Sequence, residues 1–432
     1  MPERAPTALP EGVELTELPG GMRVVTEALP SVRSVALGFW VRTGSRDEAP
    51  AQAGVSHFLE HLLFKGTARH SAIELSELFD ALGASTNAAT SKESTHLHAR
   101  FLDEHTERVF ELLAEMLLGP TFPEVDSERQ VVLEEIAMYE DEPQDRVHDV
   151  LAEAVWGDHP LGRRVLGEAD VIAGIPVPEI AAYHSSRYTS ANIVVAAAGN
   201  LEHGRIAELA ERHLRPPEGD GHGPGPAPVA RPALAFQEKA TEQYHVCFGG
   251  GGIARADERR FALSVLDAVF GGSISSRLFR EVREKRGLAY SVGSYTDQYT
   301  DGGMIAMYVG TREENVAEAC EVIGAELRSL HAGGITAEEL ARGKEHVKGR
   351  MVLSLEPTSA RMNRLGRSLL FGVPLLSLDE MLERVDAVTL DDVAALAAEL
   401  YDPARLSAAA IGADAERFRA AAEAVSPAVV AA

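Results

Sequence analysis

The sequence has few cysteines and is short of basic charge, and each shortage narrows the class of protein. Only two cysteines occur in 432 residues, Cys247 and Cys320, and they have no CxxC spacing. This argues against a disulfide framework and a thiolate zinc site, so two buried thiols are expected. The 41 Lys and Arg face 66 Asp and Glu, giving a net charge of −25. Because phosphate contacts need clustered basic residues, no nucleic-acid partner is expected.

Long apolar runs are also missing. The longest, residues 193–198 and 369–376, fall well short of the roughly 18–20 residues that span a bilayer. The first 20 residues are acidic and proline-rich, without the basic start and apolar stretch of a signal peptide. We therefore expect a cytoplasmic protein that has no membrane partner.

A proline- and glycine-rich stretch divides the chain into two nearly equal parts. Residues 216–232, PPEGDGHGPGPAPVARP, offer almost nothing to bury and are typical of a linker. The predicted organisation is therefore a first domain at residues 1–215, the linker at 216–232, and a second domain at 233–432.

The two parts look like divergent copies of one pattern. Each begins with a strand-like run (34–42 and 244–248) that leads into a helix, and each continues with an alternating run (85–101 and 289–309). Two helical patterns follow, beginning near residues 104 and 124 in the first part and near 313 and 336 in the second. A helix is also expected from Ser71, with Glu74 completing a capping box. Strands mixed with helices in each copy predict an α+β fold.

The most informative motif is H-x-x-E-H at residues 57–61. Helical spacing puts His57, Glu60 and His61 on one side of a helix. Two histidines four residues apart can bind one zinc ion, and a carboxylate beside the metal can deprotonate a bound water. The alternative is a solvated polar face, but the neighbouring residues are mostly apolar and favour burial.

A zinc site with three protein ligands needs another donor. The helical segment at residues 124–139 is the best source, since Glu128 and Glu135 are two helical turns apart on one stripe. The spacing leaves open whether these glutamates bind metal or are ordinary surface residues of an acidic helix.

Three segments together resemble a known family: HFLEHLLFKGT, SERQVVLEEIAMYED and SSRLFREVREKRGLAYSV. They resemble the pitrilysin-type (inverzincin, HxxEH) zinc metallopeptidases, and most closely the bacterial branch that is similar to mitochondrial processing peptidase. The resemblance covers residues 24 to 410. It implies two homologous domains, each a sheet covered by helices, that face each other as a clamshell.

The resemblance also implies roles for individual residues. His57, His61 and Glu135 would bind one Zn²⁺ per chain, Glu60 would be the general base that activates the zinc-bound water, and Glu128 would support the ligands from behind. The segment at residues 86–90, with Asn87 and Ala88, would be an edge strand that binds the substrate backbone.

The second domain lacks the metal-binding residues and would be accessory, but it would supply Arg283 and Tyr290 as donors to the oxyanion. The function implied is a zinc metalloendopeptidase that cleaves unstructured peptides enclosed between the two domains. The alternative is a non-catalytic subunit that binds peptides or serves a structural role. Because one chain carries both sets of catalytic residues, a homodimer is expected.

An acidic cluster follows the predicted zinc helix directly: Glu140, Asp141, Glu142, Asp145 and Asp149. Residues 1–215 carry 18 basic and 35 acidic side chains, and residues 216–432 carry 23 and 31. The cluster would either favour basic peptides or form a solvated acidic loop, and the sequence leaves both open.

Overall fold

The computed structural model describes residues 9–219, 221, 223 and 225–429, and they form two compact units. The first unit consists of the described residues within Met1–Ile136, Arg164–Gly225 and Val352–Ser377, and the second of those within Ala137–Arg163, Pro226–Met351 and Leu378–Ala432. Two long helices, α4 (Val125–Asp141) and α11 (Ala337–Ser354), cross from one unit to the other.

The first unit is built on a mixed sheet in the order β1-β2-β6-β3-β5-β4. Only β2 and β6 are parallel, and the other neighbours are antiparallel. The central strand β6, sequence IVVAAAG, is buried along its whole length, which explains its continuous apolar run. The strands are β1 (Val13–Glu17), β2 (Arg23–Ala28), β3 (Ser34–Val41), β4 (Ser85–Thr90), β5 (Thr95–Leu102) and β6 (Ile193–Gly199).

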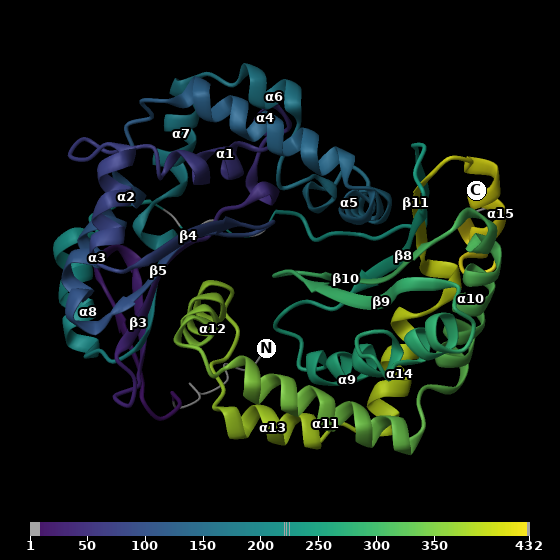
Figure 1. Cartoon of the computed structure of the whole chain (residues 1–432). Coiled ribbons are helices and arrows are strands. Elements are labelled where there is room, and N and C mark those ends of the chain that lie inside the picture. The colour runs from purple at the N-terminus through teal and green to yellow at the C-terminus, as the bar shows by residue number, and fades with distance from the viewer. Residues whose placement is uncertain (1–8, 220, 222, 224, 430–432) are drawn as a thin grey trace. The chain divides into compact units, whose positions relative to one another are not determined.

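Helices cover both faces of this sheet. On one face, apolar side chains of several helices pack on Leu37, Phe39 and Leu97. On the other face, α12 (Thr358–Leu370) packs on β2, β3 and β6 (Figure 1). The remaining helices are α1 (Val55–Leu62), α2 (Ala72–Ala81), α3 (Thr106–Leu118), α6 (Ala169–Gly174), α7 (Val177–Arg187) and α8 (His203–His213).

The contact between α12 and β3 is close enough to require glycine. A Cβ built at Gly366 would lie 2.2 Å from Trp40 Nε1, and one built at Gly38 would lie 2.6 Å from Met362 Sδ. A side chain at Gly366 would clash with the rigid Trp40 ring, whereas one at Gly38 would require the flexible Met362 side chain to move.

The second unit repeats this plan with five strands in the order β7-β11-β8-β10-β9. Only β7 and β11 are parallel. With β1 set aside, each strand has a counterpart in the same place of the first sheet, which supports the predicted duplication. The strands are β7 (Leu234–Glu238), β8 (Tyr244–Gly252), β9 (Ala289–Gln298), β10 (Gly303–Thr311) and β11 (Ser407–Gly412).

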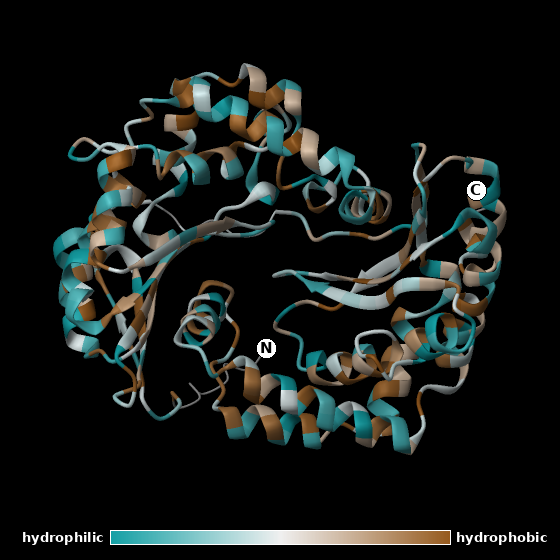
Figure 2. Ribbon diagram, in the orientation of Figure 1, coloured by the Kyte–Doolittle hydropathy of each residue, from teal (hydrophilic) through white to brown (hydrophobic). Residues whose placement is uncertain are grey.

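In this unit α5 (Pro143–Trp156) packs on β7, β8 and β11, with Val147, Leu151 and Val155 buried against the sheet. Helices of both units carry both hydrophilic and hydrophobic residues, as expected when one face of each helix is buried (Figure 2). The remaining helices are α9 (Arg260–Phe270), α10 (Val316–Gly333), α13 (Leu378–Asp386), α14 (Leu390–Leu400) and α15 (Ala415–Ala422), and a π-helical turn spans Phe279–Glu284.

The units do not follow the order of the chain. The segment with α5 comes from the first half of the sequence but packs in the second unit, and the segment with α12 does the reverse. The boundary at Gly225 and Pro226 lies inside the predicted linker, whose described residues contain no helix or strand. The predicted division at residues 215 and 233 put the α5 segment in the first domain and the α12 segment in the second.

The α+β prediction with two sheet-plus-helix domains is confirmed, and the facing clamshell arrangement stays a prediction. The capping box at Ser71 and Glu74 is present, with both reciprocal hydrogen bonds. Each alternating run contains two antiparallel strands. In the described part of the chain, no helix combines the length and the apolar character needed to cross a bilayer.

Candidate metal centre

The helix that carries the motif is fixed at its first turn. Gly54 precedes α1 with a φ of 95°, and a Cβ there would lie 2.6 Å from the Leu166 carbonyl oxygen, so glycine is required. The N–H groups of Gly54 and Ser56 donate to the buried Glu48 carboxylate at 2.8 and 2.7 Å. A carboxylate is favourable there because it meets free N–H groups and the positive end of the helix dipole. Glu48 therefore sets the position of α1.

The second helix of the site, α4, is held through its apolar stripe and one arginine. Val132 and Ile136 are buried in the core of the first unit. Arg129 lies against Phe58 of α1, donates to the Ile175 carbonyl oxygen at 2.9 Å, and also bonds that of Ile172. These contacts hold the face of α4 that carries Glu128 and Glu135 against α1.

Three of the predicted donors come together in a small triangle. His57 Nε2 and His61 Nε2 are 3.3 Å apart, and Glu135 Oε2 lies 3.6 Å from the first and 3.3 Å from the second. A tetrahedral zinc ion with bonds of about 2.0–2.1 Å separates its ligand atoms by roughly 3.3–3.4 Å. The donor set and its spacing therefore fit zinc. Among the described residues, this is the one group of three or more His, Cys, Asp or Glu side chains that could hold a metal ion.

Burial keeps His57 neutral, and a carboxylate orients the ring of His61. Burial, and then the neighbouring His61, lower the pKa of His57 to about 4, so His57 is neutral at pH 7. His61 Nδ1 lies 2.8 Å from Glu128 Oε1. Because a carboxylate only accepts hydrogen bonds, this contact places a ring proton of His61 on Nδ1 and turns Nε2 towards the triangle.

Exposure differs across the donors. The side chain of His57 is 9% exposed, whereas that of Glu135 is 43% exposed. The triangle thus lies at a surface with one open side, as a catalytic metal site needs.

Glu60 lies on the same helix and contacts the edge strand. Its carboxylate interacts with the hydroxyl and the N–H of Thr90, at the end of β4, and both interactions favour its charged form. Burial raises the pKa of Glu60 above its usual value. A carboxyl with a raised pKa is a stronger base, because it takes up a proton more readily near neutral pH.

Asn87 and Ala88 lie on β4, the last strand at one end of the first sheet, and α1 packs against this strand. Asn87 is exposed, and its Oδ1 accepts the Ala88 N–H at 2.9 Å. The Ala88 N–H therefore bonds a group other than the neighbouring strand β5.

Arg283 and Tyr290 belong to the second unit and contact each other. Arg283 Nη1 donates to the Tyr290 carbonyl oxygen at 3.2 Å, and its guanidinium lies 4.3 Å from the centre of the Tyr290 ring. Tyr290 is 78% exposed, so its hydroxyl is accessible. The π-helical turn that carries Arg283 has no counterpart in the sequence prediction.

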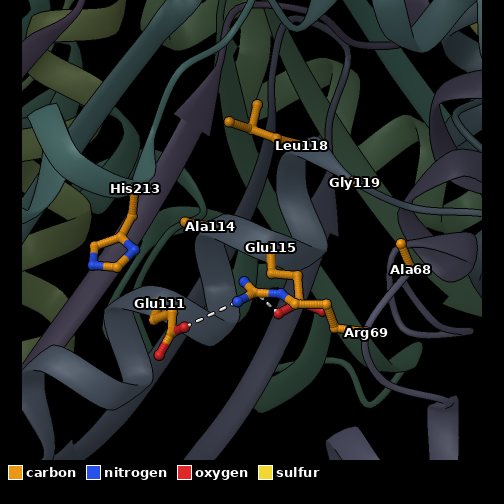
Figure 3. A pocket seen from close by; sticks show the side chains of 8 residues that line it. All are labelled: Ala68, Arg69, Glu111, Ala114, Glu115, Leu118, Gly119 and His213. Carbon is orange, nitrogen blue, oxygen red and sulfur yellow. Dashed lines mark hydrogen bonds and ion pairs between the residues drawn. The ribbon is translucent and has the colours of Figure 1, made fainter.

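A separate pocket in the first unit lies along α3 and has a volume of about 240 Å³ (Figure 3). Its one arginine, Arg69, is paired with Glu111 at 3.1 Å and with Glu115 at 2.8 Å. The metal-donor triangle is not part of this pocket, which is lined by Ala68, Arg69, Glu111, Ala114, Glu115, Leu118, Gly119 and His213.

Comparison with known proteins identifies the family. Residues 23–169 match insulinase (peptidase family M16), and residues 175–347 match the peptidase M16 inactive domain. An uncharacterized zinc protease of Streptomyces coelicolor is 43% identical over 400 residues, which cover 90% of this chain and 87% of that protein. One of Bacillus subtilis is 42% identical, over 88% of this chain and 94% of that protein. The chain belongs to peptidase family M16.

Solved structures agree with the M16 assignment. A protease from Helicobacter pylori superposes with a TM-score of 0.87 at 25% identity, over 94% of this chain and 100% of that chain. A peptidase M16 inactive domain from Pseudomonas fluorescens has the same fold, with a TM-score of 0.87 at 22% identity. The resemblance inferred from the three sequence segments is thus confirmed at the level of the family.

Three residues of this M16 site have no role in the sequence prediction. Lys65 contacts Glu128. The sequence feature that could have indicated this contact is its position four residues after His61. Thr90 lay in the predicted edge strand, but nothing there indicated a contact with Glu60. Glu48 had no local signal, because it reaches α1 from a preceding loop.

Proposed function

We propose that this M16 peptidase is a zinc metalloendopeptidase in which His57, His61 and Glu135 bind one zinc ion per chain. The observation that carries the proposal is the triangle of donor atoms at 3.3–3.6 Å. Zinc bound there would polarise the scissile carbonyl and acidify water. The names of the Streptomyces and Bacillus relatives support the choice of metal.

Glu60 is the general base in this proposal. Its part-buried carboxyl has a raised pKa, and it interacts with Thr90 of β4. It would take the proton of the attacking water and pass it to the leaving amine. Glu128 would orient His61 through the contact at Nδ1.

The edge strand would bind the substrate backbone. A peptide that adds to β4 pairs with N–H and C=O groups that do not face β5, and the Ala88 N–H is one such group. Asn87 would release this N–H as the peptide arrives. Backbone pairing makes little demand on sequence, which suits a substrate without fixed structure.

Arg283 and Tyr290 would stabilise the oxyanion that forms when water attacks the amide. A guanidinium and a phenol are suitable donors, and an accessible Tyr290 is consistent with this role. Because one chain carries both sets of residues, no second kind of chain is needed. We propose a homodimer located in the cytoplasm, and light scattering of the purified protein would test the dimer.

The proposal is tested by measuring zinc content and peptide cleavage in the same preparation. We expect one zinc per chain and internal cleavage of an unstructured peptide. A chelator should remove both, and added zinc should restore both. A protein that holds zinc fully but cleaves no unstructured peptide would instead be the non-catalytic, peptide-binding subunit.

A further inference from the structure

A chain of polar contacts continues behind the metal donors. The Glu128 side chain is only 5% exposed, and its two oxygens have different partners. Oε1 lies 2.8 Å from His61 Nδ1, and Oε2 lies 2.5 Å from Lys65 Nζ. The buried carboxylate thus joins a proposed zinc ligand to a lysine that does not belong to the donor triangle.

Lys65 is held close to this carboxylate by the backbone. It lies three residues after the end of α1, and its N–H donates to the Leu62 carbonyl oxygen at 3.2 Å. Its side chain is 29% exposed. Among the described residues, Glu128 is the one carboxylate within 4.0 Å of the Lys65 amine.

The division of the two oxygens has a geometric consequence. A carboxylate turns easily about its last side-chain bond, and a contact at one oxygen alone leaves that rotation free. With Oε2 held by the Lys65 ammonium, the plane of the carboxylate is fixed and Oε1 is aimed at His61 Nδ1. Without the ammonium, a buried oxygen would lose its partner and the carboxylate would turn to find another.

We propose that Lys65 is a positioning residue for metal binding, an inference that rests on the zinc site proposed above. Lys65 orients Glu128, Glu128 orients the His61 ring, and the ring then presents Nε2 towards His57 and Glu135. Lys65 itself touches none of the three donors.

The direction in which zinc affinity changes when Lys65 is removed distinguishes this positioning role from a simple charge effect. A positive charge near a cation site repels the metal, so a lysine that acted only through its charge would weaken zinc binding. Its removal would then strengthen zinc binding. A lysine that positions Glu128 does the opposite, because its removal disorders a ligand.

The experiment measures the zinc affinity of the metal-free protein by competition with a chelator. We expect Lys65→Met to weaken zinc binding by about tenfold, the lower end of the range for outer-shell partners of metal ligands. Lys65→Arg should stay within a factor of about three. In a Glu128→Gln protein, Lys65→Met should weaken zinc binding by less than a further twofold or so, because the carboxylate through which Lys65 acts is already gone.

Two further measurements exclude a general structural effect. With cobalt in place of zinc, Lys65→Met should have a visible absorption spectrum that differs from that of the unmodified protein. Lys65→Arg should have the same spectrum as the unmodified protein. Lys348→Met is the matched control, since Lys348 pairs with Glu345 at 2.7 Å and Asp386 at 2.8 Å on the second unit. It should leave both zinc affinity and the cobalt spectrum unchanged. If Lys65→Met does not fold, Lys65→Gln carries the same test.

Unchanged or tighter zinc binding in Lys65→Met, or full additivity with Glu128→Gln, would overturn the proposal. These results differ from a failure of the zinc site itself. If the unmodified protein binds zinc and His57→Ala does not, the site stands and only the role of Lys65 fails. If the unmodified protein binds no zinc, the proposed function fails first.

Discussion

The two units use the same strand order around very different side chains. In the first, the helix after β3 carries His57, Glu60 and His61. In the second, the helix after β8 carries Ser264, Asp267 and Ala268 at the corresponding positions. The later helix α4 supplies Glu135, whereas its counterpart α11 carries Lys348 and Arg350. The same backbone plan thus exists with and without a metal-donor set, so the chemistry depends on a few side chains rather than on the fold.

One contact is common to both units. Glu60 interacts with Thr90 of β4, and Asp267 accepts the Ser294 hydroxyl of β9 at 2.6 Å. In each unit, a carboxylate on the helix reaches the last strand of the sheet. The contact therefore does not require a metal, and in the first unit the histidines and Glu135 add chemistry to an arrangement that the second unit also has.

The strongest test of this comparison changes the corresponding carboxylates separately. Glu60→Gln removes the proposed base and should lower peptide hydrolysis by about 10²–10⁴ or more while zinc stays bound. Asp267→Asn should keep hydrolysis within about twofold. Turnover and zinc content are measured together, with His61→Ala as the variant that loses the metal. A fully active Glu60→Gln protein would end the mechanism proposed here.

The second test asks what the unit without metal donors contributes to catalysis. Tyr290→Phe deletes one proposed oxyanion donor and should lower the hydrolysis rate by roughly 10²–10³. Zinc content should not change, because no metal donor is altered. If the rate stays within a few-fold of the original, Arg283 and Tyr290 belong to the structure of the second unit rather than to catalysis.

A smaller effect is expected in stability. Burial raises the pKa of Asp267 to about 6. An unfolded chain releases this proton near pH 3.9, so the folded state binds more protons between about pH 4 and 6. The stability that Asp267 contributes is therefore lost as the pH rises through that window.

Asp267→Asn has no such titration. Relative to the original protein, its free energy of unfolding should rise by up to about 2–3 kcal/mol between pH 4 and pH 6, and level off above. Urea unfolding at several pH values measures the difference. A difference that does not vary with pH would mean that this carboxylate is solvated in the folded protein.

The smallest expected effect concerns the acidic cluster at residues 140–149. Two of its members are paired, Glu140 with Arg146 at 3.5 Å and Asp141 with Lys239 at 3.0 Å. We still expect an arginine-bearing unstructured peptide to have a kcat/KM a few-fold above that of a matched acidic one, because charges of one sign attract the opposite sign. The ratio should shrink as salt rises from about 0.05 to 0.5 M. Equal rates at low salt would leave the cluster as solvated surface.

Local features of the site could be predicted from the sequence because they depend on short spacings. His57, Glu60 and His61 share one side of α1 through the geometry of a single helix turn, and the Ser71 capping box is equally local. Glu135 is different, since nothing in its own helix separates it from a surface glutamate. It was singled out by resemblance to a family, and the structure then brought it to the two histidines.

The amino-acid sequence by itself determined the α+β class and the placement of the H-x-x-E-H motif on one side of a helix, because apolar periodicity and helical spacing act over a few residues. Only the tertiary structure decided that α5 packs on the second sheet and α12 on the first. An amphipathic helix shows that one face must be buried, but not against which of two similar sheets. The contacts of Glu48, Thr90 and Lys65 were decided in the same way, because each joins segments that only the fold brings together.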